Sequence, residues 1–222
     1  MIEQLPDVLS ALVNDGFTFG ELQGGGIAGV AIGAVLTRLL RKRAETAREL
    51  LLTELRRGEK PLTAPEVEEA VAVVYRYFRA AQEGAARLNL RLMAKVIAGQ
   101  SHLGRLTASE FMADAEMLAS LKYQEVVLLG TMYHAWTADW FQEQDPRVRL
   151  GALYEWVGTK LVPAVFRDIE ELRATAGAIT RTGLLKPEPT LGFTVFSPTP
   201  LLDRLNSLVP LEAAIREEDG AS

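Results

Sequence analysis

A histidine and a group of carboxylates are the residues of this chain whose chemistry comes nearest to catalysis or metal binding. His134 lies close to Asp139 in the sequence. Three further carboxylates share one short segment: Glu110, Asp114 and Glu116. Such side chains act as general acids and bases or as metal ligands. None of them completes an E-x-x-H pair, and the neighbouring Tyr133 and Trp136 favour His134 as a packed, hydrogen-bonded core residue.

The composition narrows the chemistry further. Cysteine is absent, so disulfides, thiolate ligands and cysteine nucleophiles are excluded. His102 and His134 are the only histidines, which disfavours a zinc or iron site. No serine-hydrolase, P-loop or dinucleotide-binding motif occurs. We therefore expect no enzymatic activity, no metal ion and no other cofactor. With 222 residues, of which 48% are hydrophobic and 24% charged, the chain is expected to fold around a core in a reducing compartment.

A glycine-rich apolar stretch from Leu22 to Thr37 is the most distinctive pattern. Three glycines, which we call the glycine zipper, recur at every fourth position: Gly25, Gly29 and Gly33. In a helix they share one face, on which a second backbone can approach closely, while apolar residues such as Ile27 and Val30 cover the other sides. Three glycines inside a helix cost about 2 to 3 kcal/mol relative to alanine. Close helix packing or membrane contact is expected to offset that cost.

The apolar stretch ends in a basic run of four residues: Arg38, Arg41, Lys42 and Arg43. Cations placed there could contact anionic lipid headgroups, as in an interfacial membrane anchor. A helix of sixteen residues spans about 24 Å, less than the roughly 30 Å hydrocarbon core of a bilayer, which disfavours a single transmembrane span. The alternative is a core helix whose glycines permit a neighbouring helix to cross closely.

A second group of cations, the basic stripe, falls on neighbouring helical positions: Arg76, Arg79, Arg87, Arg91 and Lys95. Such a face could bind the phosphates of nucleic acid or lipid. The alternative, which we favour, is pairing within the molecule, because residues 107–145 carry seven acidic residues and one lysine.

Helical periodicity after Gly24 predicts a mainly α protein. Capping boxes are expected at Thr63 with Glu66 and at Thr107 with Glu110. Apolar residues spaced as in a coiled coil predict that the helix over 63–98 packs against the one before it or against another copy. The expected helices cover 6–13, 26–57, 63–98, 107–119, a segment capped by Ser120, 145–163, 164–182 and a last one through Leu208.

These helices imply four regions. Residues 1–58 form the glycine-zipper arm, and 59–106 form a long basic helix that packs on it as a helical hairpin. Residues 107–209 form a helical body, and 210–222 are expected to be a C-terminal tail. The body ends in a two-stranded hairpin between Leu184 and Phe196, where alternating bulk replaces helical periodicity.

The order of elements in this body resembles the end of a winged-helix domain. A helix is followed by "RTGLL", by a ribbon that ends in "FTVFSPTP" and by a helix that contains "LLDRL". The chain as a whole is similar to the Abi-alpha type of bacterial phage-resistance proteins, which are helical, of comparable size and wing-like at the C-terminus. The resemblance implies a role in phage defence and assigns no site residue.

Together the patterns predict a non-enzymatic cytoplasmic protein, peripheral to the inner face of the membrane. It would act through self-association as a homo-oligomer or through membrane contact of the glycine zipper, and its C-terminal part would bind an unidentified protein partner. A nucleic-acid-binding winged-helix regulator and a hydrolase are the alternatives. DNA binding is less favoured because residues 163–205 carry five basic and five acidic residues, with Arg173, Arg181 and Lys186 as the available contacts.

Overall fold

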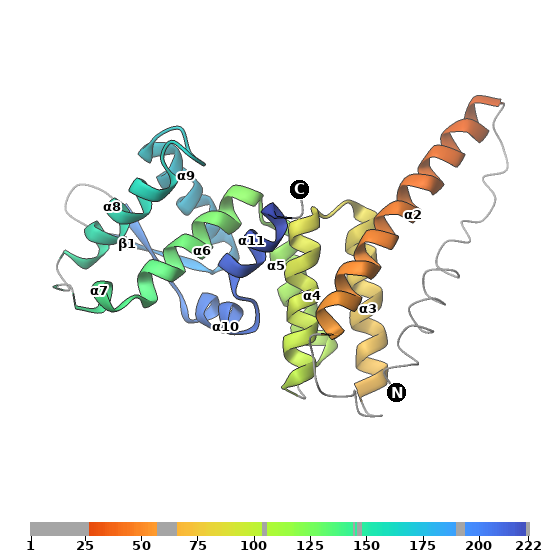
Figure 1. Cartoon of the computed structure of the whole chain (residues 1–222), viewed down its shortest axis with the longest axis horizontal. Coiled ribbons are helices and arrows are strands. Elements are labelled where there is room, and N and C mark those ends of the chain that lie inside the picture. Colours follow the sequence, from red (N-terminus) through yellow and green to blue (C-terminus); the bar gives the residue numbers. More distant parts are fainter. Residues whose placement is uncertain are drawn as a thin grey trace. The chain divides into compact units, whose positions relative to one another are not determined.

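A computed structural model of the chain describes residues 27–56, 66–103, 106–143, 145, 148–189 and 194–220. For residues 27–35, 66–68 and 102 it describes the backbone alone. The described chain is mainly helical and has one small antiparallel sheet near the C-terminus, as the sequence predicts (Figure 1). It divides into two compact units, residues 1–119 and 120–222. The helix expected over 6–13, Gly25 and the Thr63 capping box lie outside the described residues.

The described part of the first unit contains four helices: α2 Ile27–Arg56, α3 Glu66–Glu83, α4 Arg87–His102 and α5 Ala108–Ser120. α2 packs against both α3 and α4. From Leu40 onward, one face of α2 is buried through Ala44, Ala47 and Leu51, at steps of three and four residues that return to the same side of a helix. Alanines on this face allow the neighbouring helices to approach closely.

The prediction of a single helix over 63–98 is wrong, because two helices, α3 and α4, cover this region. The chain leaves the helix at Gly84, whose φ of 98° lies in the left-handed region that glycine adopts without strain, and α4 starts again at Arg87. Folded back beside α3, α4 contributes the larger share of the packing against α2. The predicted packing against the preceding helix is found, although two helices provide it. Val71 at the beginning of the predicted seam is exposed, whereas Val74 and Phe78 of α3 and Leu92 of α4 are buried.

The predicted capping box at Thr107 is also not formed. The Thr107 hydroxyl is buried and has no hydrogen-bond partner. The backbone N–H of Ala108, the first residue of α5, donates instead to the carboxylate of Glu69 on α3. A side chain from another helix thus satisfies the helix start that the sequence assigned to a local threonine.

The second unit is arranged around α6 Tyr123–Thr137, which packs against α8 Arg149–Leu161, α9 Ile169–Ile179 and α11 Leu211–Asp219. Its hydrophobic core includes Val126, Leu128, Leu129 and Met132 of α6. The remaining elements are a short helix, two strands and one further helix: α7 Asp139–Gln142, β1 Leu185–Pro189, β2 Thr194–Pro198 and α10 Pro200–Leu208.

The starts of α6 and α9 depart from prediction. Ser120 belongs to α5 and does not cap α6, which starts after Lys122. α9 starts later than expected because the Asp168 carboxylate accepts a hydrogen bond from the backbone N–H of Glu171, 2.9 Å away. A 3-10 turn, Thr180–Thr182, extends α9 to the predicted stop at Gly183.

Residues 211–219 of the predicted tail form α11. Leu211 and Ala214 of this helix are buried, and Gly130 of α6 allows the close approach. A Cβ at Gly130 would lie 3.2 Å from the Ile215 side chain and 3.4 Å from that of Leu211. The sheet pairs β1 with β2 in antiparallel register from Leu185 opposite Pro198 to Pro189 opposite Thr194, and confirms the predicted hairpin.

Candidate functional site

The first half of α2 extends past α3 and α4 (Figure 1). Leu36 and Leu39 are each 45% exposed there, although Leu40 in the next position is buried. Three cations of the basic run, Arg38, Arg41 and Lys42, are exposed beside these leucines. From here on, the arm means residues 27–42 of α2 alone, a narrower range than the glycine-zipper arm expected over 1–58. It places apolar and basic side chains together at the surface of the first unit.

The glycines of the arm continue the packing face of α2. Positions 29, 33, 36, 40, 44, 47 and 51 follow one another at steps of three or four residues, so in this helix they share one side. From Leu40 onward that side is buried against α3 and α4. Gly29 and Gly33 lie on its extension, whereas the side chains of Ile27 and Val30 lie outside the described part of the structure.

A cavity of about 260 Å³ lies where α2 passes the turn between α3 and α4. Lys42 and Arg43 of α2 and Arg87 of α4 line it. The other lining residues are Leu39, Thr46, Ala81, Ala85 and Leu90. The fold thus brings members of the basic run and the basic stripe to one place. The sequence analysis gives no sign that these two groups meet, because it does not predict the turn at Gly84 between α3 and α4.

The rest of the basic stripe does not form one surface. Arg79 Nε lies 2.8 Å from Glu83 Oε1, and Arg76 Nη1 lies 3.8 Å from the other oxygen of that carboxylate. Arg91 is buried, and Lys95 Nζ lies 3.4 Å from Glu54 Oε2 in the interior. These ion pairs are intramolecular, as the favoured alternative held, and their acidic members, Glu54 and Glu83, lie on α2 and α3.

Lys95 and Glu54 belong to a polar cluster inside the first unit. Tyr77 of α3 is fully buried, and its hydroxyl donates to the Ala47 carbonyl of α2 at 2.9 Å. Burial raises the pKa of Tyr77, and the charges of Arg91 and Glu54 are close enough to act on it. The inner residues of the stripe therefore hold α2, α3 and α4 together.

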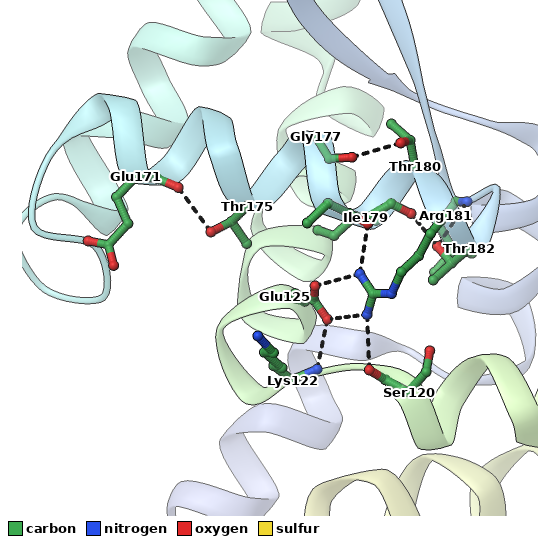
Figure 2. Close-up of polar contacts among 12 residues, drawn as sticks. Ser120, Lys122, Glu125, Glu171, Thr175, Gly177, Ile179, Thr180, Arg181 and Thr182 are labelled. Atoms are coloured by element: carbon green, nitrogen blue, oxygen red, sulfur yellow. Dashed lines mark hydrogen bonds and ion pairs between the residues drawn. The ribbon is translucent and has the colours of Figure 1, made fainter.

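The cations available to a DNA-binding wing are engaged in ion pairs. Figure 2 shows the guanidinium of Arg181 against the carboxylate of Glu125, at 2.7 and 2.8 Å, with the Ser120 carbonyl accepting at 3.0 Å. Arg173 Nη1 lies 2.8 Å from Glu170, and Lys186 Nζ lies 2.8 Å from Glu188. These pairs reduce the net positive charge that phosphate binding would require.

In the ion pair between Arg181 and Glu125, the glutamate is the buried member, with a side chain that is 4% exposed. Burial acts to raise the pKa of the Glu125 carboxyl, but hydrogen bonds from Arg181 and from the backbone N–H of Lys122 outweigh it and lower that pKa. Arg181 therefore fastens the end of α9 to the start of α6.

The prediction that His134 is a core residue is wrong. Its side chain is 56% exposed, its Nδ1 lies 3.2 Å from Glu212 Oε2 of α11, and its ring stacks on Trp156 at 6.0 Å. The sequence missed this pair because α11 was expected to be a tail. Within the described chain, no group of three or more histidine or acidic residues could hold a metal ion, and Asp114 is buried against Gln100 while Glu110 and Glu116 are exposed.

Comparison with protein-family models, with curated proteins and with solved structures finds no match to this chain. Among the helices that the structure describes, none is both long enough and apolar enough to cross a membrane.

Proposed function

We propose that this chain is a non-enzymatic interaction protein whose arm attaches to an anionic membrane surface or to a second copy of the chain. The observation that carries the proposal is the position of the arm: it leaves the helical body with Leu36 and Leu39 exposed beside Arg38, Arg41 and Lys42. The zipper supports the same proposal, because Gly29 and Gly33 extend a face that elsewhere packs against helices.

The magnitudes favour a combined contact. A basic residue near an anionic membrane contributes about 1 kcal/mol, so the three exposed cations supply roughly 3 kcal/mol, which alone corresponds to binding weaker than millimolar. Leu36 and Leu39 would have to enter the interface, or two arms would have to pair, to give stable attachment. The second unit then serves as the module that binds a partner, and the resemblance to Abi-alpha proteins suggests phage defence as the setting.

The test combines vesicle flotation with light scattering on the intact chain. We expect attachment to vesicles that contain anionic lipid, or a concentration-dependent oligomer, and loss of both in the double variant Leu36→Asn, Leu39→Asn. Leu103→Asn is the matched control, because Leu103 is an exposed leucine of the first unit outside the arm. A parent chain that remains monomeric and does not float with anionic vesicles would refute the proposal.

A further inference from the structure

The cavity between α2 and the α3–α4 turn is distinguished by its charge. Three of its lining side chains are cationic, Lys42, Arg43 and Arg87, and none of the described lining side chains is a carboxylate. Thr46 adds a hydroxyl, which donates to the Lys42 carbonyl at 3.1 Å. The lining also includes apolar side chains, among them Leu39 and Leu90. Cations gathered against low-dielectric walls attract an anion more strongly than the same cations dispersed in water.

Arg43 is held in place within this group. Its Nη1 donates to the Gln82 carbonyl near the end of α3 at 3.2 Å. The same nitrogen lies 3.4 Å from the position that a Cβ on Gly84 would occupy, so the guanidinium rests on the turn itself. A cation that is already ordered loses less conformational entropy when it binds a ligand than a mobile surface side chain does.

The start of α4 adds to the positive potential. Arg87 is the first residue of this 16-residue helix, Ala86 makes no side-chain capping hydrogen bond, and the first turn contains no acidic residue. Backbone N–H groups at a helix N-terminus favour an anion nearby. This feature adds to the three cations and does not replace them.

We propose that this cavity binds a phosphomonoester group, carried either by a lipid headgroup or by a small soluble phosphate. Arginine and lysine together suit a doubly charged phosphate, which accepts several charge-assisted hydrogen bonds. A volume of about 260 Å³ falls just below the roughly 300 to 1,000 Å³ of pockets for drug-sized ligands, so the group is small. Leu39 both lines the cavity and is exposed, which leaves an apolar path toward Leu36 for a lipid chain.

The lipid form of this proposal rests on the proposed membrane attachment, whereas the soluble form does not. The first experiment therefore uses the intact chain without membranes. Calorimetric titration with inorganic phosphate and with glycerol 3-phosphate should show saturable binding at one site. Lys42→Gln and Arg87→Gln should each weaken that binding about tenfold, the effect of losing one charge-assisted hydrogen bond.

Arg41→Gln is the matched control for charge, because Arg41 is an exposed cation of the same helix that does not line the cavity. It should leave the affinity within about twofold of the parent, and circular dichroism should show all three variants to be folded. Absence of saturable binding for both phosphates, without preferential attachment to a phosphomonoester lipid, would overturn the proposal. Equal weakening by Arg41→Gln and Arg87→Gln would also overturn it.

The second experiment separates the two sources of phosphate. Phosphatidylcholine vesicles carry either phosphatidic acid, a phosphomonoester, or phosphatidylglycerol, a phosphodiester, at matched surface charge. The readout is the ratio of flotation on phosphatidic acid to flotation on phosphatidylglycerol, because Arg41→Gln should weaken flotation on both lipids alike. A preference for phosphatidic acid that Arg87→Gln abolishes and Arg41→Gln preserves assigns the cavity to a lipid headgroup. Phosphate binding in solution without that preference assigns it to a soluble ligand. Equal flotation on both lipids with no phosphate binding leaves the proposed membrane attachment intact and refutes the cavity site.

Discussion

At the scale of single residues, the cations of this chain fall into three environments that the sequence does not distinguish. Arg38 and Arg41 are exposed on the arm, Arg87 lines a cavity, and Lys95, with a side chain that is 10% exposed, pairs with the buried Glu54. Burial decides how much each charge contributes, because a charge pair in water is screened whereas a buried charge without a partner is costly. Two predictions follow from buried carboxylates, one in each unit.

Glu54→Ala is expected to destabilise the first unit by about 3 kcal/mol or more, because it leaves the ammonium of Lys95 buried opposite an uncharged side chain. Glu83→Ala is the matched control. Its carboxylate also pairs with basic side chains. Glu83 and its nearer partner Arg79 are both more than half exposed, and the less exposed Arg76 is 3.8 Å away, so the cost should stay below about 1 kcal/mol. Urea unfolding followed by circular dichroism measures both, and equal losses would contradict the buried role of Glu54.

Acid should weaken the second unit through Glu125. The pKa of Glu125 is lowered in the folded state, whereas an unfolded glutamate titrates near pH 4.3. Between these two pKa values the unfolded chain binds more protons than the folded one, so the contribution of Glu125 is present above the unfolded pKa and is lost as the pH falls through the folded pKa. Stability should therefore decline below about pH 5.

Tryptophan fluorescence can follow this decline, because the three tryptophans of the chain, Trp136, Trp140 and Trp156, all lie in the second unit. Glu125→Gln should be less stable than the parent at neutral pH and should lose less stability on acidification. Glu155→Gln, at an exposed carboxylate of α8, should keep the pH dependence of the parent. Parallel curves for Glu125→Gln and the parent would show that the pair with Arg181 has no such role.

At the scale of elements, local signals predict most of the fold but not the turn that forms the cavity. Gly183 marks the end of α9 and Thr199 caps α10, since both act through their immediate neighbours. Gly84 gives no comparable signal, because a glycine within a helical pattern can also remain in the helix. The break there depends on packing of α4 against α2, which is a property of tertiary structure. For α11, the spacing of Leu211 and Ala214 was an available signal.

The cavity, like the turn, could not be predicted from local sequence signals. Lys42 and Arg43 come from one helix and Arg87 from another, so their meeting depends on the α3–α4 turn and on the crossing of α2. Thr107 illustrates the opposite case, in which a strong local motif is present but a side chain from α3 caps α5. Sequence patterns therefore identified the cations involved, and only the fold selected which of them converge.

Gly84→Ala tests the turn directly. A φ of 98° is strained for alanine, and the substitution should cost about 1 to 3 kcal/mol. The new Cβ would make ordinary van der Waals contact with Arg43 at 3.4 Å, so the expected loss comes from the backbone. Gly151→Ala is the control: it lies in α8 with open space around it and should be neutral or stabilising by up to about 1 kcal/mol. A neutral Gly84→Ala would mean that the chain does not need the left-handed turn.

At the scale of the whole molecule, charge is unevenly distributed. The formal net charge is −5 at pH 7, which by itself repels an anionic surface. Attachment to such a membrane therefore requires the local concentration of cations on the arm, namely Arg38, Arg41 and Lys42. Because these side chains are exposed, their attraction to lipid should weaken as salt shortens the Debye length, whereas pairing of two apolar arms should not.

The glycine zipper supplies the last prediction, since close approach on its face depends on the absence of side chains. Gly29→Leu should weaken self-association, because a leucine on the extension of the packing face of α2 keeps a second helix away. It should not weaken flotation, because an added apolar side chain can enter the lipid interface. Gly29→Ala separates packing from helix formation: it adds little bulk, and its better helix propensity should stabilise α2 by up to about 1 kcal/mol. Light scattering, flotation and thermal unfolding are measured on both variants. If Gly29→Leu leaves oligomeric state and melting temperature unchanged, then the glycine face makes no helix contact, and the arm must act through Leu36, Leu39 and its cations alone.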